Sequence, residues 1–323
     1  MSQRIEESGL KVAKPIHDLV NQSILPGTGV TAAVFWDGFA AILAEFGPKN
    51  KALLDKRDQL QSQIDSWHRA NTSGFEFADY KGFLQEIGYL VPEGGEFAVS
   101  PENVDAEIAK QAGPQLVVPI MNARFALNAV NARWGSLYDA LYGNDVISEQ
   151  EGAEKAGAYN AVRGQKVIDY GRDFLDGAAP LSHGSHHQAT RYSVTAGQLI
   201  IALEDGTSAS LQAPDQLSGY LGDTDNPSSI LIKNNNLHLE LQVDYNHIIG
   251  QSDKAGVKDI VLESALTTIM DCEDSVAAVD ADDKALAYGN WLGLIKGTLE
   301  ETIIRGDSSF VRSMNPDRTY ISH

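Results

Sequence analysis

Two short segments with the character of buried strands constrain the fold of this chain more than any other feature. Residues 115–120 read Gln-Leu-Val-Val-Pro-Ile, and residues 267–270 read Thr-Thr-Ile-Met. Such runs are typical of strands buried on both faces of a parallel sheet. Polar residues follow each run, where parallel α/β sheets and barrels place their sites. Since a (β/α)8 barrel needs eight such strands, the two present predict an incomplete α/β barrel.

The residues between these segments follow a different pattern. Apolar and polar side chains alternate over residues 237–244, which predicts antiparallel sheet with one face in water. Residues 192–203 and 207–211 flank Asp205-Gly206, a dipeptide that favours a hairpin turn. An antiparallel insert between the two parallel-type segments is therefore expected.

The first 90 or so residues have helical periodicity. One helix is predicted up to Phe46, with Thr31 as its N-cap and Gly47-Pro48 as its end. A second is predicted over residues 49–69, and a third, shorter one follows near residues 80–87. This region therefore predicts a helical subdomain.

The last third of the chain alternates again between element types. The pattern predicts helices over residues 259–266 and 281–299. Residues 309–314 and 319–322 are expected to form the two arms of a hairpin.

Charge and cysteine content narrow the classes of partner and compartment. Among 323 residues, 25 basic and 44 acidic side chains give a net charge of −19, a field that repels nucleic acid and anionic membranes. The single cysteine, Cys272, forms no intrachain disulfide. With no apolar stretch of about 18 residues and no signal-peptide pattern, a cytoplasmic protein is expected.

Three carboxylates follow the second buried strand. Asp271, Glu273 and Asp274 lie where a magnesium ion or its waters could be held. The alternative is that Asp274 or Ser275 caps the next helix and the others are solvated.

Basic residues offer candidate phosphate ligands. Arg124 and Arg133 follow the first buried strand and Arg312 lies near the C-terminus; the alternative for each is a surface ion pair.

Three histidines lie close together in the sequence, and several common enzyme motifs are absent. His183, His186 and His187 have a spacing that could ligate a metal, although an exposed loop is the simpler interpretation. The chain contains no phosphate-loop, dinucleotide-binding or nucleophile-elbow motif.

Three long, specific stretches resemble malate synthase G. They are the run from Gly-Pro-Gln-Leu-Val-Val-Pro-Ile to Asp-Ala-Leu-Tyr-Gly (residues 113–143), Lys-Asn-Asn-Asn-Leu-His-Leu-Glu-Leu-Gln (233–242) and Met-Asp-Cys-Glu-Asp-Ser-Val-Ala-Ala-Val-Asp (270–280). The resemblance extends over essentially the whole chain. It implies an enzyme of the glyoxylate bypass that condenses acetyl-CoA with glyoxylate and releases malate and CoA.

The resemblance also implies a domain organisation. A magnesium-dependent (β/α)8 TIM barrel would carry an N-terminal helical clasp and an inserted α/β domain. The expected segments are the clasp (1–88), a linker with the first barrel strand (89–134), the insert (135–265), a barrel strand with its helix (266–296) and a return segment of the insert (297–323).

Residue by residue, the family's acetyl-CoA contacts fall on Val117, Arg124, Phe125, Ser275 and Arg312. Phe125 stands where some members carry tyrosine, so the ring is kept and a hydroxyl is lost. The family's catalytic residues and metal ligands have no counterpart in the chain, and the acidic residues from 271 to 274 would at most orient water on the Mg2+ ion.

Three functional hypotheses follow. In the first, the chain is a part of malate synthase that is inactive and marginally stable alone and needs a second polypeptide carrying the rest of the barrel. In the second, it is a non-catalytic module that binds acetyl-CoA or another protein. In the third and weakest, it is a different magnesium-dependent, aldolase-like lyase.

Overall fold

The computed structural model describes residues 3–155, 157–273, 277–306 and 308–322. It divides into two compact units, which we describe separately. They are Met1–Asn103 with Ala278–Gly289, and Val104–Ala277 with Asn290–His323. Within the described ranges, no helix is both long enough and apolar enough to cross a membrane.

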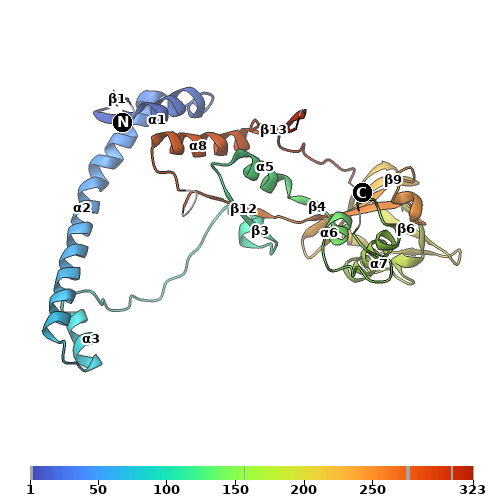
Figure 1. The fold of residues 1–323 in the computed structure, drawn as a ribbon, viewed down its shortest axis with the longest axis horizontal. Coiled ribbons are helices and arrows are strands. Elements are labelled where there is room, and N and C mark those ends of the chain that lie inside the picture. The colour runs from blue at the N-terminus through green and yellow to red at the C-terminus, as the bar shows by residue number, and fades with distance from the viewer. Residues whose placement is uncertain (1–2, 156, 274–276, 307, 323) are drawn as a thin grey trace. The chain divides into compact units, whose positions relative to one another are not determined.

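The first unit begins with a β-hairpin and continues as helices (Figure 1). Strands β1 (Arg4–Glu7) and β2 (Leu10–Ala13) pair antiparallel. Trp36 is 1% exposed and packs against Val20 and Leu25 in a small core. The helical elements are α1 (Lys14–Leu19), the π-helical turn η1 (Val20–Ile24), α2 (Ala32–Ala70) and α3 (Phe77–Glu86).

A single long helix, α2, replaces the two helices predicted on either side of Gly47-Pro48. Its start is as predicted, because Thr31 caps it and accepts a hydrogen bond from a first-turn N–H at 3.3 Å. Pro48 lies inside the helix and leaves the carbonyl of Ala44 without an intrahelical donor. Since every residue from 41 to 50 is exposed, solvent can satisfy that carbonyl and the helix continues.

The second unit contains one continuous core between two antiparallel sheets and two helices. The helices are α6 (Leu137–Gly143) and α7 (Ala161–Ala178). The five-stranded sheet has the order β4 (Trp134–Ser136), β11 (Val257–Glu263), β10 (Leu237–Val243), β9 (Asn226–Asn234), β8 (Leu217–Asp223). The second sheet has the order β5 (Ala189–Thr195), β6 (Gln198–Leu203), β7 (Ser208–Ser210). Three short 3-10 turns are η2 (His186–Gln188), η3 (Pro214–Gln216) and η4 (Gly250–Ser252).

Two sequence predictions for this unit are wrong. The helix predicted over residues 259–266 is strand β11, which lies between β4 and β10. Buried and partly exposed residues do not alternate along β11, because both faces of the strand are covered. The apolar spacing in the sequence therefore resembles that of a helix. Residues 192–203 form not one strand but parts of β5 and β6, joined by a turn with positive φ at Ala196 and Gly197. The turn predicted at Asp205-Gly206 is confirmed.

The two barrel-like segments form a parallel pair, β3 (Gln115–Pro119) and β12 (Thr267–Asp271). Among the described residues these two strands form a sheet of their own, and no barrel is seen. The prediction that both are buried is wrong, since Val117 is 61% and Ile269 46% exposed. The helices of this region are α4 (Ala106–Ala109), α5 (Ala123–Asn131) and α8 (Ala281–Lys296), the last divided between the two units.

The C-terminal residues do not form the predicted hairpin. The hairpin lies earlier, between β13 (Glu301–Arg305) and β14 (Ser308–Arg312). Residues 313–322, which we term the C-terminal strap, run instead to the five-stranded sheet, where Ile321 and Tyr220 exchange backbone hydrogen bonds of 2.9 and 3.0 Å. The sheet had an open edge at β8, and backbone pairing there competes with a local hairpin.

The strap also covers the sheet face that the sequence pattern predicted to be in water. Glu240 on β10 is 3% exposed and accepts hydrogen bonds from Arg318 and Tyr320. The guanidinium of Arg318 lies 4.8 Å from the ring centre of Trp134. Alternation in the sequence identified this face correctly as polar. The strap buries Glu240 on it, while His238, Gln242 and Asp244 stay partly exposed.

Candidate functional site

The junction between β3 and α5 presents a cation and an aromatic ring together. Asn122 caps α5 and accepts a hydrogen bond from the N–H of Phe125 at 3.1 Å. Arg124 and Phe125 therefore lie in the first turn, at the positive end of the helix dipole. The guanidinium of Arg124 is 5.2 Å from the ring centre of Phe125, and both side chains are exposed. This end of α5 can receive an anionic group beside an aromatic face.

Arg312, the last residue of β14, contacts the same helix although it is 188 positions from Arg124 in the sequence. Its Nη1 donates a hydrogen bond to the Oδ1 of Asn128, one helical turn after Arg124. Residues four apart share a face of a helix, so α5 brings the two arginines to one side. Two of the candidate phosphate ligands are thus associated by a single helix.

Two asparagines that the sequence analysis missed hold this arrangement. Asn128 accepts the hydrogen bond from Arg312. Asn131 donates a hydrogen bond to the carbonyl of Ser313 at 2.9 Å and accepts one from the N–H of Asn315 at 2.8 Å. The spacing of three residues on a helix face was the available signal, but nothing in the sequence pointed to the partner segment. The start of the C-terminal strap is therefore attached to α5.

The remaining predicted acetyl-CoA contacts fall on either side of this helix in the sequence. Val117 lies on β3, largely exposed. Ser275 lies outside the described residues, as does Asp274.

The described part of the acidic loop forms a turn after β12. Asp271, predicted to follow the strand, is its last residue, and its Oδ1 accepts a hydrogen bond from the N–H of Glu273 at 2.9 Å. Among the described residues, no three histidine, cysteine, aspartate or glutamate side chains gather as a metal site would require. The described residues therefore do not assemble a magnesium ligand set.

The other arginine candidate has a structural role. Arg133 forms an ion pair of 2.8 Å with Glu263, whose side chain is 4% exposed, and donates to the carbonyl of Leu266 at 3.0 Å. Glu107 lies 3.7 Å away on its other side. The ion-pair alternative therefore holds for Arg133, although the pair is half-buried rather than superficial.

The three histidines have separate surroundings. His186 is buried, with its ring nitrogens 2.8 Å from the carbonyl of Ala179 and 2.9 Å from the hydroxyl of Tyr192. Burial lowers the pKa of its imidazole. His187 lies 2.8 Å from Asp173, while His183 is exposed. The expectation of an exposed loop is wrong for His186, which is a core residue.

Two family models match parts of the chain, one within each unit. Residues 17–77 match the model of the malate synthase N-terminal domain, a range that begins within α1, includes all of η1 and α2, and ends at the first residue of α3. Residues 159–234 match the model of the malate synthase G alpha-beta insertion domain, from α7 to β9.

Curated relatives match over nearly the full chain. Malate synthase G of Halalkalibacterium halodurans is 54% identical over 311 residues, or 96% of this chain. The malate synthase G proteins of Corynebacterium efficiens and Corynebacterium glutamicum are 51% and 52% identical over 320 residues, or 99% of this chain. The chain spans 43% of the length of each of these relatives. It is therefore a homologue of malate synthase G over the N-terminal part of that enzyme.

Proposed function

We propose that this chain contributes acetyl-CoA binding to the malate synthase reaction, in which acetyl-CoA, glyoxylate and water give malate and CoA. The observation that carries the proposal is the association of Arg124, Phe125 and Arg312 on α5. The two guanidinium groups would bind phosphates, and the exposed ring would stack on the adenine. Val117 would add an apolar contact, and Ser275 is proposed from the resemblance alone.

Turnover, in this proposal, requires parts of the enzyme that the chain does not supply. Its relatives are more than twice as long, and the family uses Mg2+. Because the described residues do not gather a ligand set for that ion, we assign no metal-dependent step to them. Arg124, Phe125 and Arg312 would bind and orient the nucleotide, while a second polypeptide carrying the rest of the barrel would supply the groups for proton transfer.

A CoA-release assay tests the requirement for the missing region. The chain is mixed with acetyl-CoA, glyoxylate and Mg2+, first alone and then with a polypeptide corresponding to the remaining part of a relative. We expect no release by the chain alone and release on mixing. Turnover by the chain alone would show that it already contains the acid–base groups.

Calorimetry tests the binding role separately. Acetyl-CoA should bind the intact chain, and Arg124→Ala and Arg312→Ala should each weaken binding by about tenfold, the value of one charge-assisted contact. Arg57→Ala is the matched control, because Arg57 lies exposed on α2 and pairs only with the neighbouring Asp58 among the described residues. Equal heats in all four proteins would remove both arginines from the site.

The second candidate function is a non-catalytic module that binds acetyl-CoA or another protein. The hydrophobic core between the two antiparallel sheets, α6 and α7, which we term the insertion-domain core, favours this candidate. These sheets and helices bury the core without any contribution from a barrel. Retained acetyl-CoA binding with no turnover in any mixture would favour this candidate over the first.

A further inference from the structure

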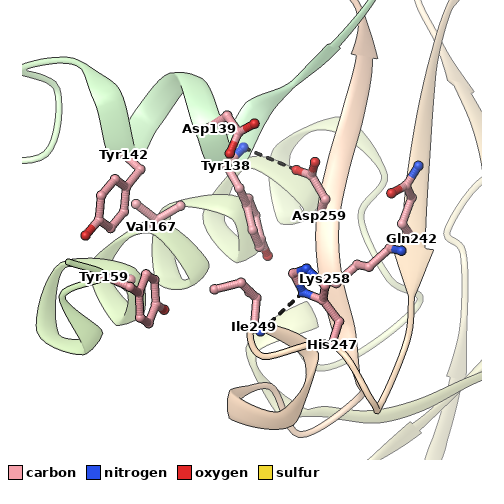
Figure 2. Close-up of a pocket in the computed structure, with 11 residues that line it drawn as sticks. Tyr138, Asp139, Tyr142, Tyr159, Val167, Gln242, His247, Ile249, Lys258 and Asp259 are labelled. Atoms are coloured by element: carbon pink, nitrogen blue, oxygen red, sulfur yellow. Dashed lines mark hydrogen bonds between the residues drawn. The ribbon is translucent and has the colours of Figure 1, made fainter. Parts of the chain in front are cut away.

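A pocket of about 390 Å3 lies in the second unit, within the region that surrounds the insertion-domain core. Side chains from α6, α7, β10 and β11 line it, together with the loops that carry residues 159 and 247–249 (Figure 2). None of the predicted acetyl-CoA contacts is among them. The pocket therefore calls for an explanation of its own.

One polar group at this pocket has no partner. Tyr138 is 7% exposed, and among the described residues its hydroxyl makes no hydrogen bond. In Figure 2 its ring points away from α6 into the group of lining side chains. Buried polar groups in folded proteins are nearly always hydrogen-bonded, so an unpaired phenol directed at a pocket indicates a ligand with a polar group.

Two acidic side chains and one lysine line the pocket, and the guanidinium of Arg172 lies near the hydroxyl of Tyr138. Asp139 and Asp259 both line it, and within the described parts of the chain no lysine or arginine nitrogen lies within 4.0 Å of either carboxylate. Burial, reinforced by the charge of Asp139, raises the pKa of Asp259. Lys258 extends toward Gln242 (Figure 2), and its amine lies 3.7 Å from the carboxylate of Asp244.

The imidazole of His247 also lines the pocket. Its Nδ1 accepts a hydrogen bond from the N–H of Ile249 at 3.3 Å (Figure 2).

An aromatic wall completes the pocket. Tyr159 stacks on Tyr142 with ring centres 5.8 Å apart and planes inclined by 15°. The hydroxyl of Tyr159 lies 1.9 Å from where a Cβ at Gly164 would be, so only glycine at this position of α7 lets the ring lie there. The wall offers apolar area and a negative ring face.

We propose that this pocket binds a small organic cation, a primary ammonium group on a short apolar or aromatic body. The ammonium would donate hydrogen bonds to the carboxylates of Asp259 and Asp139 and to the hydroxyl of Tyr138. The body of the ligand would lie against Tyr159. An ammonium has three donors and no acceptor, which matches one phenol oxygen and two carboxylates that lack a cationic partner.

Three probes of similar shape test the charge requirement on the full chain. Phenethylammonium, 2-phenylethanol and 3-phenylpropionate are titrated by calorimetry, and two-dimensional amide NMR spectra locate the perturbed residues. We expect phenethylammonium to bind at least tenfold more tightly than the other two and to shift the amide signals of residues 138, 139 and 259. Equal affinity for all three probes, tighter binding of the carboxylate, or shifts confined to other regions would overturn the proposal.

Matched variants test the residues. Asp259→Asn keeps the acceptor for its backbone contacts and should weaken phenethylammonium binding by about tenfold, whereas Asp225→Asn, in the exposed β8–β9 turn, should leave it unchanged. Gly164→Ala displaces Tyr159 and should also weaken binding, while Gly177→Ala, on the same helix with open space around it, should not.

Two further measurements keep the result unambiguous. Tyr138→Phe retains the ring and should weaken phenethylammonium binding severalfold through the loss of the hydroxyl alone. Acetyl-CoA affinity, measured in the same proteins, should not change, so a failure here is distinguishable from a failure of the proposed function. Unaltered phenethylammonium binding in Asp259→Asn and Tyr138→Phe, both folded by circular dichroism, would remove the pocket as its site.

Discussion

The insertion-domain core and the parallel strand pair use similar apolar strands but differ in what covers them. Ile230 and Ile232 on β9 are 0% exposed, because the second sheet and α7 contribute to the same core. Val117 and Ile269, on β3 and β12, are 61% and 46% exposed. The comparison shows that an apolar strand pattern reports a capacity for burial, which is realised only where other elements cover both faces.

The largest expected effect breaks the buried ion pair of the insertion-domain core. Asp253 pairs with Arg172, the two side chains being 3% and 4% exposed, and its other oxygen accepts from the N–H groups of Ala255 and Val257 at 2.9 Å. Asp253→Ala leaves a buried guanidinium unpaired and should lower the free energy of unfolding by about 3–5 kcal/mol. Urea unfolding followed by circular dichroism measures this, and a loss below about 1 kcal/mol would contradict it.

A pair of equivalent truncations tests the comparison directly. Ile230→Ala should cost about 2–5 kcal/mol, whereas Ile269→Ala should cost under about 1 kcal/mol, because its side chain is already half in water. Urea unfolding of both variants, with hydrogen exchange to identify the region affected, checks the difference. Equal losses would mean that β12 is better covered in solution than these exposures indicate.

Acid should weaken the insertion-domain core in particular. Burial lowers the pKa of His186 below its ordinary 6.5, so the unfolded chain takes up a proton more readily than the folded one. The free energy of unfolding is therefore unaffected by His186 above pH 6.5. It decreases as the pH falls from 6.5 toward the lower pKa of His186 in the folded chain, by at most about 1.4 kcal/mol per pH unit. Urea unfolding at several pH values measures the slope.

The control variants for this pH effect lie in the same loop. His186→Gln should flatten the slope between pH 6.5 and 5.5, whereas His183→Gln, at an exposed position, should leave it as in the parent chain. A slope that survives His186→Gln would assign it to other groups.

The smallest expected effect concerns the less covered region. Asn128→Ala removes the contact that holds Arg312 on α5, and acetyl-CoA affinity should fall by roughly threefold to tenfold, the value of one net hydrogen bond. Calorimetry measures it, with Asn50→Ala on the exposed face of α2 as the control. No change in affinity would leave Arg312 without a role in the site.

The fold was predictable where one element or turn is set by nearby residues. Thr31 started α2 as expected, and Asp205-Gly206 turned a hairpin, because a cap or a turn involves only adjacent backbone groups. The prediction failed at β11, where burial on both faces removed the alternation, and at Pro48, where solvent exposure made a break unnecessary.

The candidate site was predictable residue by residue but not as an arrangement. The sequence identified Arg124 and Arg312 as candidate phosphate ligands because basic residues are scarce in this acidic chain. It identified Arg133 for the same reason, but Arg133 forms a half-buried ion pair with Glu263. Only the contact between Arg312 and Asn128 separates these cases. The sequence does not show that Arg312 contacts Asn128, because the two residues are 184 positions apart.

By itself, the sequence determined the relationship to malate synthase G, the acidic surface charge, the helical start and the antiparallel character of the insert, because these depend on composition, local periodicity and long specific motifs. Tertiary structure alone decided that the C-terminal strap covers Glu240, that His186 is a core residue and that α5 associates two distant arginines. Such features depend on which faces and edges remain for packing once local elements have formed, and that selection is made by the whole chain at once.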